Sequence, residues 1–290
     1  MPKTKNNLPI LSEKVQFTFL SVSLIVYVIT ATYWISLLVR VYPNGMRFSE
    51  FSVAAMSEII FPIILFAIAY LTINKSISRL NRLFKASLFA FMGFLVLIWA
   101  ALLSRWIMSS STLFSEWPAH WNVIIPLLVT LIVYIGFVIW PNRPTGQVAI
   151  DRRLQVVFLA IASVSFVLTA ILGTKHTIGQ YLGDQDIINL LTDSRVVVAA
   201  ILPAIFFAIA YRMISTGKNL ANRLFATGIY TITGIMIAHA IALLCTLSIW
   251  YLSVGDSYPE LLFTIQTAVV TWISLLVYGA IIVCHGRAKK

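Results

Sequence analysis

The chain has 290 residues, of which 60% are hydrophobic and 11% are charged, and its formal net charge is +11. Soluble globular domains contain roughly a quarter charged residues and about half apolar ones, so this composition excludes a water-soluble domain. The contents of 13 Gly and 10 Pro are ordinary, which excludes a collagen-like chain. Basic residues are scattered along the sequence rather than clustered, so we expect no nucleic-acid partner.

Eight apolar stretches are long enough to cross a hydrocarbon core about 30 Å thick as a helix. Lipid offers no hydrogen-bond partner to the backbone, so a spanning segment of this kind must be helical. The stretches cover residues 16–39, 52–74, 86–107, 121–140, 154–174, 195–214, 226–251 and 261–284. The sequence therefore predicts an all-α integral membrane protein with eight transmembrane helices.

The distribution of Lys and Arg predicts how the helices are oriented in the bilayer, because cytoplasmic segments carry an excess of basic residues. One alternate set of segments holds only Arg40, Arg47, Arg105, Lys175 and Arg195, which leaves 16 of the 21 basic residues in the other set. The basic set includes both ends of the chain. We expect a multi-pass protein of the cell (cytoplasmic) membrane with both termini in the cytoplasm, facing an anionic inner leaflet.

An internal repeat divides the chain. Residues 62–84 align without a gap to residues 203–225 at an offset of 141, with 12 of the 23 positions identical and both copies containing FAIAY and NRLF. This predicts two four-helix units, 1–143 and 144–290. Each unit has an even number of spans, so the copies share one orientation and form a parallel 4+4 repeat about an axis along the membrane normal.

The layout of each unit, with a proline in its second helix, a basic cytoplasmic loop and an aliphatic third helix, resembles an uncharacterised four-helix membrane domain of small-genome bacteria. That family favours an acidic residue late in the third helix, whereas the second unit here has Ala238-His239-Ala240 near the middle of that helix. The resemblance covers both units and implies a bacterial membrane protein of unknown function.

Glu58 is the first candidate for a functional residue, because an ionisable side chain inside a membrane helix must be protonated, paired or hydrated. The aligned residue of the second unit is Ala199. The candidate partners of Glu58 are Arg195, Arg105 and His239. A proton- or cation-linked site and a plain interhelical salt bridge both remain open.

His239 lies in the middle of the seventh span, where the first unit has Ile98. A hydrogen-bonded packing histidine is the simpler interpretation, since the sequence shows no second histidine to complete a haem or metal site. Together with Gln266 it could also line a polar cavity.

Two further pairs of residues recur in both units. Pro62 and Pro203 are candidate helix hinges, because a proline within a helix frees the carbonyl four residues earlier, although a static kink is the alternative. Asn81-Arg82 and Asn222-Arg223 form a repeated cytoplasmic motif, in which Asn can cap the third helix and Arg can bind headgroup phosphate. A docking loop or a gate between the units is the alternative for this motif.

No metal-binding, nucleotide-binding or catalytic motif is present, so the sequence predicts no metal, no cofactor and no enzymatic activity. Our first hypothesis is a non-enzymatic structural or accessory subunit of a membrane complex. Candidate protein partners of the chain are other membrane subunits or, outside that role, a second copy. A small secondary transporter or channel, with its site between the two units, is the second. A membrane-embedded enzyme is third, and only Glu58 and His239 could serve it.

Overall fold

The computed structural model describes residues 11–41, 56–73, 77–110, 121–139, 152–181, 200–214, 219–252 and 260–287. Every regular element in these ranges is a helix. The elements are α1 (Glu13–Val41), the π-helical turn η2 (Met56–Ile60) running into α3 (Phe61–Thr72), α4 (Arg79–Ser110), α5 (Trp121–Ile139), α6 (Arg152–Tyr181), α9 (Leu202–Met213), α10 (Leu220–Leu252) and α11 (Glu260–Arg287). Each of the eight predicted stretches overlaps one α-helix, so the prediction of an all-α chain is confirmed for the described residues.

Four of these helices are long and apolar enough to cross a membrane. The qualifying segments are Glu13–Leu37 in α1, Arg79–Ala100 in α4, Leu220–Ser248 in α10 and Gln266–Cys284 in α11. The remaining apolar helices have shorter described segments, of 10–17 residues. The helices therefore fit a membrane protein.

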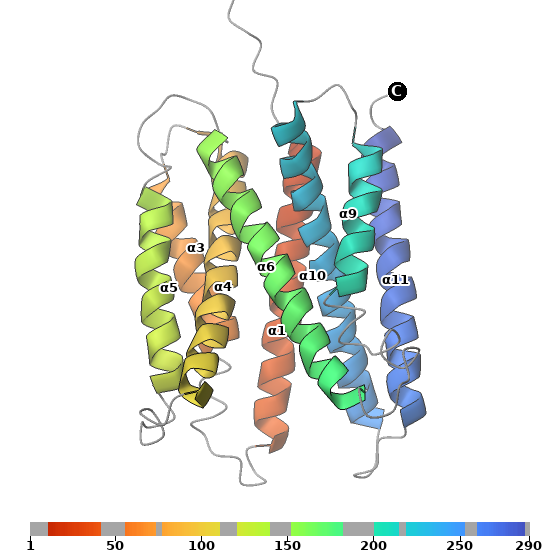
Figure 1. Ribbon diagram of the computed structural model, residues 1–290. Coiled ribbons are helices and arrows are strands. Elements are labelled where there is room, and N and C mark those ends of the chain that lie inside the picture. Colours follow the sequence, from red (N-terminus) through yellow and green to blue (C-terminus); the bar gives the residue numbers. More distant parts are fainter. Residues whose placement is uncertain are drawn as a thin grey trace, which may run out of the picture.

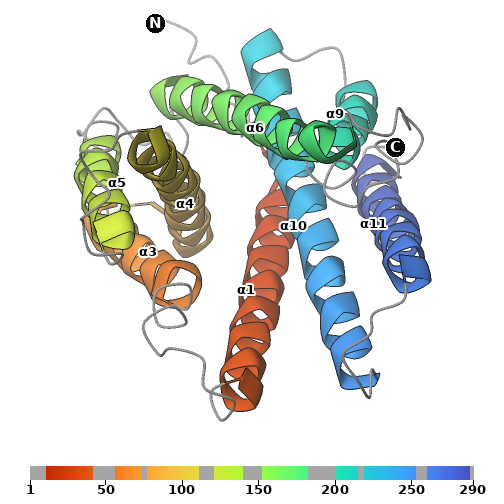
Figure 2. The same cartoon turned by 60° about the horizontal axis from the view of Figure 1, so that its bottom comes forward.

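The helices form two groups, α3–α5 and α9–α11, with α1 between them and α6 crossing one face (Figure 1). In the first group, which we call the first triplet, α4 packs against α3 and α5, and in the second triplet α10 packs against α9 and α11. Figure 2 shows α1 lying between the triplets and α6 running across one side of the bundle, where it packs against both α4 and α10. Helix α1 packs more extensively against α10 than against α4, so it ties the first half of the chain to the second.

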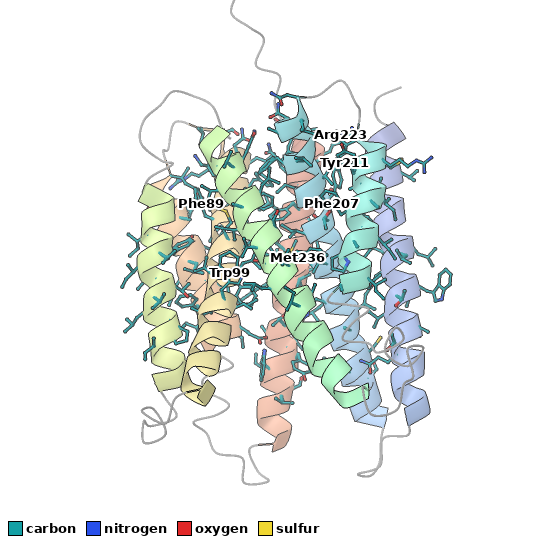
Figure 3. The ribbon with its side chains drawn as sticks, viewed as in Figure 1. Phe89, Trp99, Phe207, Tyr211, Arg223 and Met236 are labelled. Carbon is teal, nitrogen blue, oxygen red and sulfur yellow. The ribbon has the colours of Figure 1, made fainter. Side chains whose placement is uncertain are left out.

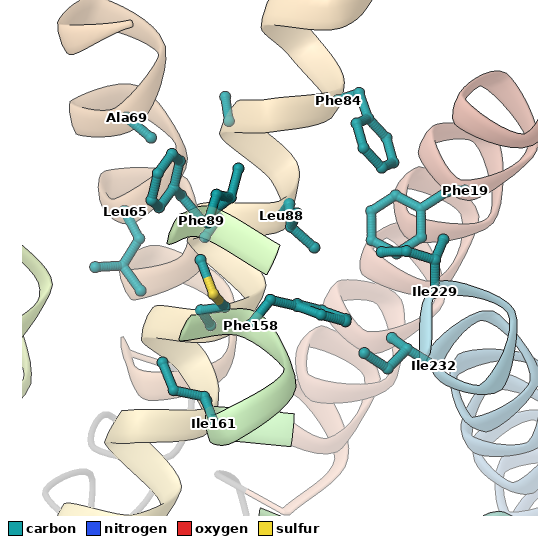
Figure 4. Packing of buried hydrophobic residues seen from close by; sticks show 14 of the residues in the cluster. Phe19, Leu65, Ala69, Phe84, Leu88, Phe89, Phe158, Ile161, Ile229 and Ile232 are labelled. Atoms are coloured by element: carbon teal, nitrogen blue, oxygen red, sulfur yellow. The ribbon is translucent and has the colours of Figure 1, made fainter. Parts of the chain in front are cut away.

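A buried apolar cluster joins the triplets through α1 and α6 (Figure 4). Two edge-to-face aromatic pairs lie in it: the ring centroids of Phe19 and Phe84 are 5.4 Å apart, and those of Phe158 and Phe225 are 5.1 Å apart. A smaller buried cluster, which includes Phe206 and Tyr278, lies within the second triplet.

Each triplet is closed by the same contact between its outer helices. The Tyr134 hydroxyl on α5 donates a hydrogen bond of 2.7 Å to the Leu65 carbonyl on α3. In the second triplet the Tyr278 hydroxyl on α11 donates to the Phe206 carbonyl on α9 at 2.9 Å. The tyrosine rings approach α4 and α10 at glycines. A Cβ atom at Gly93 would stand 2.6 Å from Tyr134 Cδ2, and one at Gly234 would stand 3.0 Å from Tyr278 Cδ2 and 2.8 Å from Phe206 Cδ2. A side chain at either glycine would clash, so the close packing of each triplet requires this residue.

Candidate functional site

Glu58 lies in the π-helical turn η2, next to α1. Its half-buried carboxylate accepts a hydrogen bond of 2.7 Å through Oε2 from the Trp34 indole Nε1. The Tyr33 ring stands edge-on to that of Trp34, with centroids 5.7 Å apart and planes at 81°. The partner of Glu58 that the structure shows is thus an indole, which was not among the predicted partners.

His239 lies on α10, and both α10 and the η2 turn that carries Glu58 pack against α1. The His239 side chain is exposed, and within the described part of the chain it makes no hydrogen bond or ion pair with the Glu58 carboxylate. The structure therefore places both predicted residues beside α1 without joining them in one site.

Of the other two residues of the predicted polar site, the structure describes one. Gln266 donates a hydrogen bond of 3.0 Å from Nε2 to Thr246 Oγ1, which links α11 to α10. The Thr246 hydroxyl in turn donates to the Ala242 carbonyl at 2.9 Å. Gln266 thus serves the contact between two helices of the second triplet. Arg195 lies outside the described residues.

Both candidate hinges lie just after a helical distortion. Pro62 and Pro203 stand in the first turn of α3 and α9, and the residues directly before these helices, 56–60 and 200–201, are π-helical. Proline is tolerated in the first turn because the N–H that it lacks is not needed there. Next to Pro62, the Ile59 carbonyl accepts a hydrogen bond of 3.2 Å from the Tyr27 hydroxyl. Movement about these prolines stays a prediction.

The prediction that Asn81 and Asn222 cap the third helix of each unit is wrong. Helix α4 begins at Arg79 and α10 at Leu220, so both asparagines lie inside the first turn. The caps are the residues three positions earlier. Ser78 Oγ accepts a hydrogen bond of 3.4 Å from the Asn81 N–H, and Asn219 Oδ1 accepts one of 3.1 Å from the Ala221 N–H.

The arginines of the repeated motif find their partners inside the protein, which the sequence did not predict. Arg82 donates to the Tyr70 carbonyl from Nε at 3.0 Å and from Nη2 at 2.5 Å. Arg223 donates from Nη2 to the Tyr211 carbonyl at 2.6 Å. Each guanidinium carbon also lies 3.8 Å from the centroid of the same tyrosine ring, and Figure 3 shows Arg223 beside Tyr211.

These contacts have a clear physical cause. The last four carbonyls of an α-helix lack intrahelical partners, and a positive charge at that end is favoured by the helix dipole. Tyr70 and Tyr211 stand in the last turns of α3 and α9. The arginines therefore fasten the C-terminal end of one helix to the first turn of the next.

Two buried glutamines were not predicted from the sequence. Gln16 on α1 and Gln155 on α6 are each only 3% exposed, and each precedes by three residues a phenylalanine of the central cluster, Phe19 or Phe158. These pairs are 139 residues apart, whereas the comparison of the two halves used an offset of 141. The tyrosines that close the triplets are 144 apart. A comparison that allowed insertions between helices would have found both.

The fold defines a helical protein with apolar helices suited to a membrane, and the Glu58 carboxylate among them is hydrogen-bonded to Trp34. Among the described residues, no group of three or more His, Cys, Asp or Glu side chains could hold a metal ion. No family model, no curated protein and no solved structure matches the chain.

Proposed function

We propose that the chain is a non-enzymatic structural or accessory subunit of a membrane complex. In this proposal it crosses the cytoplasmic membrane eight times as two tandem four-helix units, 1–143 and 144–290, with both termini in the cytoplasm. The start of α1 and the end of α11 lie at the same end of the bundle (Figure 1), which supports an even number of crossings.

Contacts at matched positions support the two tandem units. The Arg82–Tyr70 contact recurs as Arg223–Tyr211, and the stacked pair Phe66–Tyr70, with centroids 5.9 Å apart, recurs as Phe207–Tyr211 at 6.0 Å. All of these residues are related by the offset of 141 found in the sequence. Duplicated sequence with duplicated contacts is what a tandem duplication would leave.

One observation carries the subunit role: the polar side chains between the described helices bind mainly backbone carbonyls. Tyr27, Tyr134 and Tyr278 do so through hydroxyls, and Arg82 and Arg223 through guanidinium groups. Such bonds hold helices in place, since a polar group in an apolar setting is costly without a partner. Polarity used in this way favours a rigid scaffold over a chemical centre.

The test is the native mass of the protein after gentle extraction from its own membrane, with every co-purifying chain identified. A stoichiometric complex with other polypeptides would support the subunit role, and the partners would name the process. Recovery of the protein as a lone monomer would overturn it. A homodimer would also count against an accessory role in a larger complex.

A small secondary transporter or channel is the second candidate, and the half-buried Glu58 carboxylate among apolar helices favours it. Ionisable residues inside a membrane mark ion pathways by default, and transporters built from repeats bind their ions at the repeat interface. Purified protein in sealed vesicles should then move ions or solutes in response to an imposed gradient. Equal fluxes in empty vesicles and in vesicles with the protein, over a broad panel of solutes, would remove this candidate.

A further inference from the structure

The helix formed by η2 and α3 consists of two segments that are attached to different neighbours. Helix α3 packs against α4 and α5, and two of its carbonyls accept hydrogen bonds, from Arg82 on α4 and from Tyr134 on α5. The η2 turn, which runs into α3, packs against α1. Because α1 packs more extensively against α10 than against α4, η2 is attached through α1 to the second half of the chain, whereas α3 is fixed in the first triplet.

Two hydrogen bonds from α1 hold the η2 turn, and we call them the α1 latch. The Trp34 indole Nε1 donates to Glu58 Oε2 at 2.7 Å. The Tyr27 hydroxyl donates to the Ile59 carbonyl at 3.2 Å. The two donors are seven residues apart, which is about two helical turns, so they lie on one face of α1. One bond fixes a side chain of η2 and the other fixes its backbone.

The residues of the α1 latch are not repeated in the second unit. At the offset of 139 that matches α1 to α6, Tyr27 corresponds to Phe166, which has no hydroxyl. Trp34 corresponds to Gly173, and Glu58 is aligned with an alanine. The tyrosine, arginine and glycine contacts within the triplets, by contrast, recur in both units. The fold of a unit therefore does not require the latch, which is an addition specific to the first unit.

The latched turn meets α3 at a weak point of the helix. Pro62 in the first turn of α3 has no N–H to donate to η2, which is itself π-helical. Proline and π-helical turns are two of the identified causes of kinks in helices. The chain stays helical through this joint, as the backbone angles of Ile60 show (φ −77°, ψ −44°). At such a joint the axis of the helix can change direction while both segments remain helical.

We propose that the Pro62 joint is a hinge between the two halves of the protein and that the α1 latch holds this hinge in the arrangement described above. The η2 turn follows α1 and the second half, while α3 stays with the first triplet. A displacement of one half against the other is therefore taken up at the joint. The proposal goes beyond both candidate functions, because such a hinge serves a scaffold as well as a transporter.

The hinge is tested by double electron–electron resonance in lipid nanodiscs, with spin labels at exposed positions and both native cysteines replaced by alanine. Labels at Ile60→Cys and Arg79→Cys span the joint, whereas labels at Ile132→Cys and Arg79→Cys lie within the first triplet and form the control pair. Both pairs should give one distance population in the otherwise unaltered protein. Loss of the latch in Tyr27→Phe with Trp34→Phe should add a second population to the pair across the joint only.

The outcomes for the latch are distinct. If neither pair changes in the double variant, the two hydrogen bonds do not restrain η2 and the proposal is overturned. A change of the same kind in both pairs would show a general loosening of the bundle and would also overturn it. If the double variant does not fold, Tyr27→Phe alone, which inserts the residue of the second unit, is judged by the same outcomes.

The position of the hinge is tested by adding Pro62→Ala to the protein without the latch, because alanine supplies the N–H that proline lacks. The second population of the pair across the joint should then be lost. The matched control is Pro203→Ala, which makes the same change in the second unit and should leave that population in place. Persistence of the second population in Pro62→Ala would place the motion elsewhere and overturn the hinge. Ion flux, or its absence, affects none of these outcomes.

Discussion

At the scale of single residues, Gly93 decides whether the first triplet can pack. Gly93→Ala should lower the free energy of unfolding by about 1–2 kcal/mol, since overpacking costs about 1–3 kcal/mol and the better helix propensity of alanine returns up to about 1 kcal/mol. The cause is the clash of the new methyl group with Tyr134 and Leu65. The matched control is Gly136→Ala, because a Cβ atom there meets nothing within 4 Å. Denaturation in mixed micelles measures both, and equal stability of the two variants would contradict the packing.

Tyr134 makes a second, separable contribution at the same place. Tyr134→Phe keeps the ring against Gly93 but removes the hydrogen bond to the Leu65 carbonyl, so it should cost about 0.6–1 kcal/mol. Tyr278→Phe should cost a similar amount in the second triplet. The double variant should show the sum, since the two bonds lie in different triplets. The same unfolding assay checks this, and a stability equal to that of the unaltered protein would show that the hydroxyls contribute nothing.

At the scale of elements, the contact between the end of α3 and the start of α4 depends on the guanidinium group of Arg82. Arg82→Lys should lower stability by about 1–2 kcal/mol, because an ammonium group cannot both bind the Tyr70 carbonyl with two N–H groups and lie flat on the tyrosine ring. The exposed Arg79 on the same helix is the matched control, and Arg79→Lys should stay within about 0.5 kcal/mol. Thermal unfolding in detergent compares them, and an Arg82→Lys protein as stable as the control would show that the contact is incidental.

The elements themselves were largely predictable from the sequence, and their partners were not. Continuous apolar stretches reveal helices because the hydrophobic run is a local property of the chain. The pairing of Arg82 with the Tyr70 carbonyl depends on how α3 and α4 pack together, which no local pattern encodes. The π-helical turn before Pro62 was likewise not predicted, because a continuous apolar run does not distinguish a π-helical from an α-helical turn. Glu58 was found from its cost in an apolar run, whereas Trp34 could emerge as its partner only from the packing of α1.

At the scale of the whole molecule, the tandem arrangement has a sharp consequence for the second helix of each unit. The described segment from Met56 to Thr72 contains 5 and 12 residues in η2 and α3, and the matching segment contains the π-helical residues 200 and 201 and the 12 residues of α9. At 1.5 Å per residue these described segments are about 25 Å and about 21 Å long, less than the hydrocarbon thickness of about 30 Å. The proposed topology needs both helices to cross, with membrane thinning or neighbouring residues completing the span.

Cysteine labelling tests that crossing. In a background with Cys245 and Cys284 replaced by Ala, Asn44→Cys should react with an impermeant maleimide from outside intact cells. Lys75→Cys should react only after the membrane is opened, because the segment between these positions crosses once. The second unit supplies the matched pair, Asp184→Cys outside and Lys218→Cys inside. Labelling of both members of a pair from the same side would mean that this helix turns back within the membrane. If only one of the two pairs were labelled from a single side, the two units would not share one orientation. That result would contradict the parallel repeat.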